Sequence, residues 1–276
     1  MTTKRQRASL LSTVQSTRTV TVKRVKPTGD QRRLELVTKA TTKKQHQPAD
    51  ATTLKLKIDH LQTFDALTEN QQRFFDLYKS GSIFMGMFGS AGVGKTFLAM
   101  YKALEEALDK SSIYKKVVVV RSCVPTRDVG FLPGTIEEKQ EVYEMPYKEI
   151  CTTLFDRSDA YDKLKEQGVI EFISTTAIRG ITIDDAIVIV DEAQSNTYHE
   201  LSTVVTRIGN RSKIIFCGDM RQNDLIKSKN DVSGFQEFQK IARSMREFSE
   251  ISFTTDDIVR SSLVKNWIIA AESFGH

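Results

Sequence analysis

Eight consecutive residues, 89–96, have the spacing most suggestive of chemistry in this sequence, because they read Gly-Ser-Ala-Gly-Val-Gly-Lys-Thr. They match the pattern G-x-x-x-x-G-K-[ST], in which backbone N–H groups surround the phosphates of a nucleotide. Glycine suits such a loop because it adopts positive φ and lets the backbone approach the ligand closely. The sequence therefore predicts nucleotide contacts, with ATP or GTP as ligand, from Gly89, Ser90, Ala91, Gly92, Val93, Gly94, Lys95 and Thr96.

A second segment, residues 186–194, reads Ala-Ile-Val-Ile-Val-Asp-Glu-Ala-Gln and predicts a buried strand that ends in two carboxylates. In such a site Lys95 would reach the β and γ phosphates and Thr96 would hold Mg²⁺. Asp191 would lie near the metal, and Glu192 would orient or deprotonate the attacking water. Adjacent residues on an extended strand point to opposite faces, so both carboxylates can face the ligand only if the strand ends there.

Three more segments could complete the site. Gln222 follows the next strand in Gly-Asp-Met-Arg-Gln, where its amide would sense the γ phosphate; a turn without such a role is the alternative. Gln71 has the paired donor and acceptor that suit the edge of adenine, although a glutamine on a helix more often faces solvent. Arg121, Thr126 and Arg127 would hold a polynucleotide backbone, and a rigid Pro-Gly turn in the same loop is an equal alternative.

The composition fits one sizeable domain, or a domain with an appendage, since the chain has 276 residues of which 39% are hydrophobic. No apolar stretch in the sequence is long enough to span a membrane, and the first residues lack a signal-peptide pattern. The three cysteines are odd in number and widely spaced, which fits neither a disulfide framework nor a zinc site. We therefore expect a cytoplasmic protein without a membrane partner.

The basic charge of the chain is concentrated in its first fifty residues. Residues 1–50 hold twelve Lys/Arg and three Asp/Glu, whereas residues 51–276 hold 28 basic and 32 acidic side chains. Residues 1–50 are rich in polar residues and show no sustained period, so we expect a mostly disordered tail before a folded domain at 51–276. An arm attracted to nucleic-acid phosphates and a solvated leader without a partner are equal interpretations of this tail.

Strands and helices are expected to alternate along the rest of the chain. Alternation of this kind implies an α/β fold with a doubly wound parallel sheet and flanking helices. Thr197 and Glu200 form a capping-box pattern, Gly209 suits the end of that helix, and Pro146 is expected to interrupt or kink its own helix. The expected strands are 83–88, 116–121, 169–173, 186–190, 213–217 and 251–253, and the other expected helices are 67–80, 95–108, 137–155, 235–248 and 263–272.

In this order the motifs resemble the PhoH-like proteins, phosphate-starvation-inducible ATPases related to superfamily 1 helicases. The resemblance runs from about Leu67 to Glu272 and implies a RecA-like P-loop NTPase core that works on RNA or DNA. The chain departs from the family pattern at Ile181, where a basic residue is usual, at Val142 and at Ser195. The motifs that carry the resemblance begin with residues 89–96, called the phosphate loop below. The others are Gly130-Phe-Leu-Pro-Gly134, Arg179-Gly180, Asp191-Glu-Ala-Gln194, Thr206-Arg-Ile-Gly209, Gly218-Asp219 with Gln222, and Asp257-Ile-Val-Arg260.

The related helicases hold ATP between two RecA-like halves, and one half donates an arginine to the phosphates. Only about fifty residues follow Gln222, too few for a second half by that analogy. An arginine finger is therefore expected from the C-terminal segment or from a neighbouring subunit, with Arg260 as the candidate. The alternative is a surface arginine paired with Asp256 or Asp257, which would contribute little energy.

These observations predict an ATPase that uses Mg²⁺ and acts as a homo-oligomer, with a ring as one arrangement, on RNA or single-stranded DNA. A nucleotide-dependent switch that recruits a protein partner without unwinding is the main alternative. A small-molecule kinase is a weaker one, because Asp-Glu-Ala-Gln suits the activation of water better than transfer to a metabolite. Polynucleotide stimulation of ATP turnover would favour the first hypothesis.

Overall fold

A computed structural model of the chain describes residues 55–123, 136–219 and 234–274, apart from the side chains of 136–140. Its centre is a six-stranded sheet in the order β3-β2-β4-β5-β1-β6, in which all neighbouring strands are parallel. This confirms the α/β fold with a doubly wound parallel sheet. The strands are β1 (Phe84–Gly89), β2 (Lys116–Arg121), β3 (Ile170–Ser174), β4 (Ala186–Val190), β5 (Lys213–Gly218) and β6 (Phe248–Phe253).

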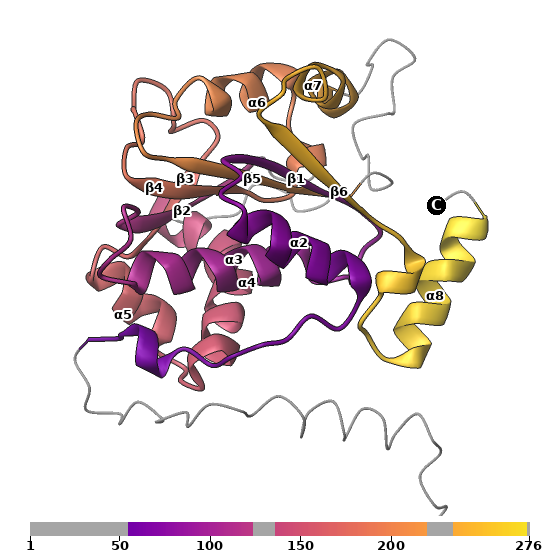
Figure 1. The fold of residues 1–276 in the computed structure, drawn as a ribbon, viewed down its shortest axis with the longest axis horizontal. Helices are drawn as coiled ribbons and strands as arrows, with labels where there is room; N and C mark the ends of the chain where they lie inside the picture. The colour runs from indigo at the N-terminus through magenta and orange to yellow at the C-terminus, as the bar shows by residue number, and fades with distance from the viewer. Residues whose placement is uncertain (1–54, 124–135, 220–233, 275–276) are drawn as a thin grey trace, which may run out of the picture. The chain divides into compact units, whose positions relative to one another are not determined.

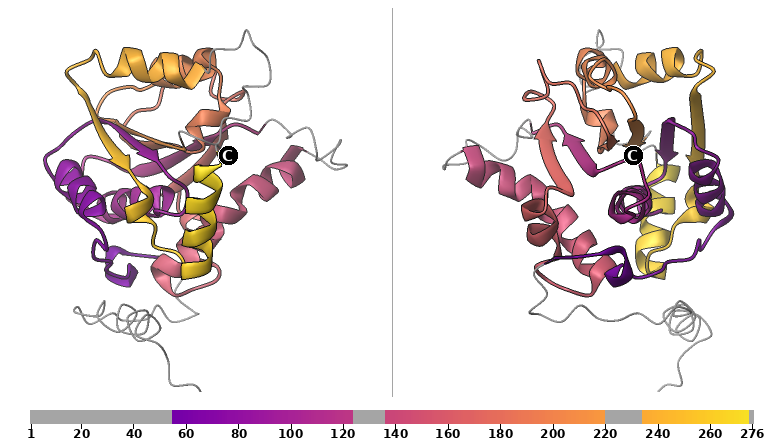
Figure 2. Two further views of the ribbon diagram at one scale, coloured as in Figure 1. Left: turned by 90° about the vertical axis from the view of Figure 1, so that its right-hand side faces the viewer. Right: turned by 60° about the vertical axis from the view of Figure 1, so that its left-hand side comes forward.

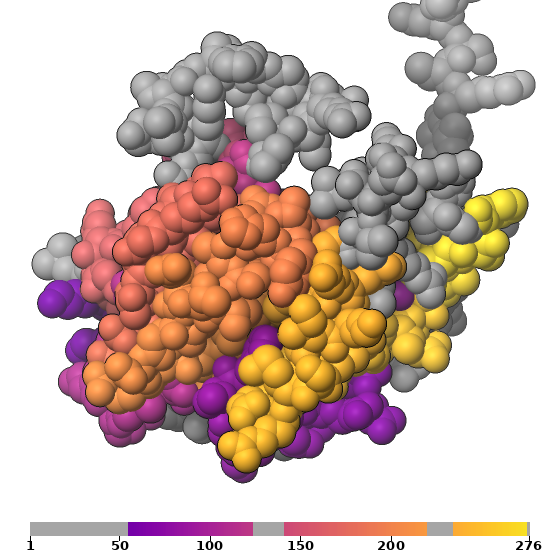
Figure 3. Space-filling model, turned by 90° about the horizontal axis from the view of Figure 1, so that it is seen from above, coloured from indigo at the N-terminus to yellow at the C-terminus, as the bar shows by residue number. Residues whose placement is uncertain are grey.

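Helices cover both faces of this sheet (Figure 1). α2, α3, α4 and α5 lie on one face, while α6 and α7 lie on the other, which is the face viewed in Figure 3. α8 lies beyond the end of β6, at the side of the molecule (Figure 2). The helices are α2 (Glu69–Lys79), α3 (Lys95–Leu108), α4 (Ile136–Phe155), α5 (Ala160–Glu166), α6 (Tyr198–Val205), α7 (Gly234–Ala242) and α8 (Ser262–Ser273), with short 3₁₀ turns η1 (Ile58–His60), η2 (Ala193–Ser195) and η3 (Thr255–Asp257).

The strands have apolar side chains on both faces, as a sheet covered by helices requires. Along β1, Met85 and Met87 pack into the core beneath α2 and α3, whereas Phe84 and Phe88 pack into the core beneath α6 and α7. The same alternation divides the buried residues of β2, β4 and β5 between two hydrophobic cores. The sheet therefore lies between two apolar layers, and polar side chains that could bind a ligand are expected at the ends of its strands.

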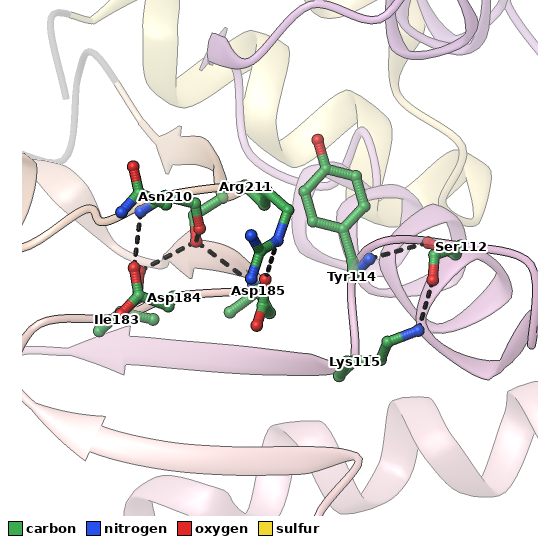
Figure 4. Close-up of polar contacts among 10 residues, drawn as sticks. Ser112, Tyr114, Lys115, Ile183, Asp184, Asp185, Asn210 and Arg211 are labelled. Carbon is green, nitrogen blue, oxygen red and sulfur yellow. Dashed lines mark hydrogen bonds and ion pairs between the residues drawn. The ribbon is translucent and has the colours of Figure 1, made fainter.

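Polar contacts join the loop before β4 to the loop before β5, at the amino ends of these strands (Figure 4). The backbone N–H of Asn210 donates to a carboxylate oxygen of Asp184 at 2.6 Å, and Arg211 forms an ion pair with Asp185. The Ser212 hydroxyl donates to the carbonyl oxygen of Ile183 at 2.9 Å. These polar groups of the two loops therefore have their partners within the chain.

The structure corrects three expectations about individual elements. α5 was not expected. α7 ends at Ala242 instead of continuing to 248, and Phe248 begins β6. The helix that follows β4 ends at Val205 rather than at Gly209, and the Asp184 carboxylate approaches Gly209 so closely that a side chain there would collide with it.

The capping box expected after β4 is confirmed. Thr197 and Glu200 form a capping box at the start of α6, with the Glu200 N–H donating to the Thr197 hydroxyl. A fourth expectation is corrected at Pro146: α4 is continuous from Ile136 to Phe155 with this proline inside it, so it does not interrupt the helix. Within the described ranges, no helix is both long and apolar enough to cross a lipid bilayer.

Candidate nucleotide-binding site

The phosphate loop connects the carboxyl end of β1 to the first turn of α3, an edge where parallel α/β sheets bind ligands. Gly89, Gly92 and Gly94 have φ of 131°, 75° and 86°, a region that favours glycine. A Cβ atom on Gly89 would lie 1.9 Å from the carbonyl oxygen of Phe253, so β6 leaves no room there for a side chain. The loop therefore requires glycine at its start both for conformation and for packing.

Lys95 is folded back over the loop that precedes it. Its Nζ donates hydrogen bonds to the carbonyl oxygens of Gly89 at 2.9 Å and Ser90 at 2.8 Å. Burial lowers the pKa of the Lys95 ammonium, and the nearby carboxylates of Asp219, Glu192 and Asp191 oppose that shift. Because its hydrogen bonds go to neutral carbonyl oxygens, the Lys95 ammonium would gain a stronger, charge-assisted partner in an anionic phosphate group.

Thr96 and Asp191, the two residues expected to serve Mg²⁺, are in direct contact. The Thr96 hydroxyl donates to Asp191 Oδ1 at 2.7 Å, and the hydroxyl of Tyr147 donates to Asp191 Oδ2 at 2.8 Å. Tyr147 comes from α4 and is fully buried. Both oxygens of the Asp191 carboxylate are thus held in place from two helices.

Arg121, at the end of β2, extends this chain of contacts. Its guanidinium is hydrogen-bonded to the Tyr147 side chain. Burial acts against the charged form, but the neighbouring Tyr147 and Asp191 raise the pKa of Arg121 above its usual value. The side chain is therefore engaged inside the site, and its expected contact with a polynucleotide backbone stays a prediction.

Glu192 lies two residues past the end of β4 and has a left-handed backbone, φ 49° and ψ 45°. The strand has ended there, which is the condition for both carboxylates to face the site. Gln194 Nε2 donates to the Glu192 carboxylate at 2.6 Å, and Gln194 Oε1 accepts from the backbone N–H of Asp219 at 2.9 Å. The buried Gln194 side chain thus links the carboxylate after β4 to the end of β5.

A pocket of about 440 Å³ opens at this edge, bounded on one side by α4. The part of the chain that the structure describes has no cluster of three or more His, Cys, Asp or Glu residues able to hold a metal alone. Thr96 and Asp191 supply two oxygen donors, and Mg²⁺ commonly combines one or two such protein ligands with phosphate and water oxygens. The residues therefore fit a magnesium ion that is bound together with a nucleotide. The pocket lining includes Ala91, Gly92, Gly94, Lys95, Thr96, Phe97, Pro146, Glu149, Asp191, Glu192, Gly218, Asp219 and Arg260.

Gln71 lies behind the phosphate loop, buried in the core side of α2. Its Nε2 donates to the carbonyl oxygen of Val93 at 3.0 Å, and its Oε1 accepts from the backbone N–H of Leu67 at 2.8 Å. The amide therefore braces the loop and does not face solvent as glutamine on a helix usually does. Its expected contact with adenine stays a prediction.

The segment after β6 packs against the phosphate loop of its own chain. The N–H of Val259 donates to the carbonyl oxygen of Gly92 at 3.2 Å, and the Ser90 hydroxyl donates to Glu272 of α8 at 2.9 Å. Arg260 is exposed and lines the pocket. Among the described residues it forms no ion pair with Asp256 or Asp257, and the Asp257 carboxylate instead accepts from Asn70 at 2.8 Å.

Part of the expected site lies outside the described residues, namely Gln222, Thr126 and Arg127. Two side chains that shape the site had no role assigned from the sequence. Gln194 belonged to a motif that was recognised for its carboxylates, and Tyr147 had no local signal at all. Only folding brings Tyr147 to Asp191.

Known proteins are similar to the part of the chain that contains this site. The family model described as PhoH-like protein matches residues 63–272. A PhoH-like protein of Mycobacterium leprae is 33% identical over 81% of this chain and 62% of its own length, and one of Bacillus subtilis is 34% identical over 74% and 62%. Protein PhoH2 of Bacillus subtilis is 41% identical over 50% of this chain and 32% of its own. The chain thus spans about 62% of the length of the first two relatives.

Proposed function

Because the chain belongs to the PhoH-like protein family, we propose that it binds ATP with Mg²⁺, hydrolyses it, and couples hydrolysis to RNA or DNA as a homo-oligomer. The observation that carries the proposal is the 2.7 Å hydrogen bond between Thr96 and Asp191 beside Lys95. A hydroxyl, a carboxylate and an ammonium meet at one end of a glycine loop. That combination suits a triphosphate with its magnesium ion.

One group of side chains in the site would bind the magnesium ion and the phosphates. Thr96 and Asp191 would hold Mg²⁺, which when bound neutralises charge on the β and γ phosphates. Lys95 would exchange a carbonyl partner for phosphate oxygens without leaving the loop. Backbone N–H groups of the loop and of the α3 amino end would bind the remaining phosphate oxygens.

Glu192 would act on the nucleophile. Its carboxylate accepts a hydrogen bond from Gln194, which leaves further lone pairs to orient a water molecule and accept its proton. Gln194 is anchored at Asp219 and holds Glu192 in its left-handed conformation at the mouth of the pocket. Arg260 would stabilise the charge that develops on the phosphate, within one chain or across a subunit boundary.

ATP turnover measured with Mg²⁺, in the absence and presence of RNA, single-stranded DNA or duplex DNA, tests the proposal. We expect turnover that requires Mg²⁺ and rises with one of the single-stranded polynucleotides. Lys95→Ala serves as the inactive control. Absence of ATP binding by the folded wild-type protein would refute the nucleotide assignment.

A nucleotide-dependent switch that recruits a protein partner is the second candidate. The contact between Ser90 and Glu272 favours it, because this contact links the phosphate loop to the exposed helix α8. The same assay separates the candidates. A switch predicts ATP binding and turnover that no polynucleotide changes.

A further inference from the structure

The outward surface of α8 is a continuous apolar stripe. Leu263, Trp267 and Phe274 are 78%, 73% and 82% exposed, and the exposed Ala270 lies between the last two in the sequence. Spacings of four, three and four residues place these four side chains on one face of the helix, with Phe274 at its C-cap. Val264, which is also exposed, flanks this stripe.

The inward surface of α8 has the more polar character. Lys265, Ile268 and Glu272 are half-buried on the opposite side, where Glu272 accepts a hydrogen bond from Ser90 of the phosphate loop. A surface helix normally turns its apolar stripe toward the core of its own domain. In α8 Ile268 does so, whereas the stripe with the largest side chains of the helix faces away from the core and stays exposed in the described fold.

The chemistry of the stripe identifies the class of partner. The charged residues of α8 are Lys265 and Glu272, and both belong to the inward side. RNA or DNA is held mainly by Lys and Arg contacts to phosphate, and the stripe offers none. An apolar surface without charge instead suits an apolar protein surface.

We propose that the apolar stripe of α8 binds the same stripe of a second copy of the chain, with the two helices antiparallel about a two-fold axis. Such an arrangement makes each residue meet its counterpart reciprocally. With the axis between Ile268 and Ile269, Trp267 lies against Ala270 of the second copy and Leu263 lies against Phe274. The largest side chain thus faces the smallest, which is the fit that close packing requires.

The exposed area is large enough for the centre of a dimer interface. Aromatic side chains bury about 150–250 Å² each, so Trp267 and Phe274 at their observed exposures would bury about 230–390 Å² per copy. Stable interfaces bury about 600–1,000 Å² per partner. The two aromatic side chains thus supply less than half of that area, and Leu263, Val264 and the polar residues around the stripe supply the rest.

This inference deepens the proposed function, since it names the surface through which the oligomer forms. Because the inward side of α8 touches Ser90, the contact between copies lies one helix away from the phosphate loop. Self-association and nucleotide binding can be measured separately on the same protein. The test of assembly can therefore be separated from that of the ATPase.

Trp267 is the one tryptophan of the sequence, so its fluorescence reports directly on the stripe. The full chain is examined by sedimentation velocity and tryptophan emission over about a 100-fold range of protein concentration, because assembly follows mass action. We expect a monomer–dimer equilibrium, with emission moving to shorter wavelength and acrylamide quenching decreasing as the dimer forms. Ala270→Arg, which adds bulk and charge at an exposed position, should weaken association by more than about tenfold.

Ile113→Arg is the matched control, because Ile113 is an apolar residue 51% exposed elsewhere on the molecule, and it should assemble as wild type does. A wild-type protein that is monomeric throughout would overturn the proposal. Assembly unchanged by Ala270→Arg, or assembly in which Trp267 stays fully quenchable, would also overturn it by showing that another surface is used. Binding of a fluorescent ATP analogue is measured in the same samples: its loss in an intact dimer would count against the proposed function alone.

Discussion

Removing the hydroxyl of Tyr147 tests whether the proposed Mg²⁺ site depends on the support that α4 gives to Asp191. Tyr147→Phe keeps the ring and its packing but deletes the donor that lies 2.8 Å from Asp191 Oδ2. Burial, followed by the charge of Asp191, raises the pKa of Tyr147 well above its usual value. The hydroxyl is therefore a permanent donor at any working pH, and the variant removes one defined interaction.

The structure sets the size of the expected effect. Asp191 would retain its bond to Thr96 but lose the partner of its second oxygen. A hydrogen bond to a charged group contributes about 1.5–3 kcal/mol. Loss of a group that supports a metal ligand typically costs about 10–100-fold in metal affinity. We therefore expect Tyr147→Phe to raise the Mg²⁺ concentration needed for half-maximal ATP binding by about 10–100-fold.

The assay is a Mg²⁺ titration of fluorescent-ATP binding, run beside a thermal melt of each variant. Tyr143→Phe is the matched control, since Tyr143 lies one turn earlier in α4 and is only half-buried; its Mg²⁺ requirement should equal that of wild type. A Tyr147→Phe protein that melts normally and needs no more Mg²⁺ than wild type would refute the reasoning.

The remaining predictions concern turnover and assembly. Lys95→Ala should lose nucleotide binding while its circular dichroism and melting temperature stay near wild type, and retained affinity and turnover would contradict the nucleotide site. Glu192→Gln should bind Mg²⁺·ATP but hydrolyse it about 10²–10⁴-fold more slowly; normal turnover in this variant, with Asp191→Asn inactive, would mean that the two carboxylates have other roles. Arg260→Ala should bind ATP and turn it over slowly, and mixing it with Lys95→Ala should restore part of the activity if the arginine acts between subunits. Co-assembly of the two variants without rescue would exclude that arrangement. Deleting residues 1–50 should leave ATP turnover without polynucleotide unchanged. If the tail is a nucleic-acid arm, deletion should also flatten the salt dependence of duplex binding, by about 0.9 in the log–log slope for each phosphate that the tail neutralises. Equal slopes for the two proteins would favour the solvated leader.

Much of the sheet could be predicted because its strands and the first helix have strong local patterns. The ranges expected for α3, β2 and β4 match the observed Lys95–Leu108, Lys116–Arg121 and Ala186–Val190. Runs of β-branched residues mark the two buried strands, and the glycine loop marks where the helix begins. Local signals of this strength need no knowledge of the tertiary structure.

The sequence pattern did not predict those elements and contacts that depend on tertiary structure. The apolar spacing of α7 continues toward Phe248, but Phe248 instead pairs with β1 and packs edge-on against Phe84, with ring centroids 4.8 Å apart. α5 is only two turns long, too short for a periodic signal. In the site, the two ligands expected for Mg²⁺ could be inferred from motifs, whereas the contacts Tyr147–Asp191 and Ser90–Glu272 join distant segments that no motif connects.

The position of β1 in the sheet affects when the protein matures during synthesis. Among the strands that the structure describes, β1 comes first in the chain, yet its two neighbours are β5 and β6, the last two of that set. Because non-local parallel pairing has to wait for both partners, β1 leaves the ribosome as an unpaired apolar strand. Gly89 gains its contact with Phe253 only after residue 253 has emerged, so the loop at 89–96 cannot complete its packing before then. Until then β1 is an exposed apolar segment of the kind that chaperones bind. A nucleotide bound at the loop would stabilise only the folded domain.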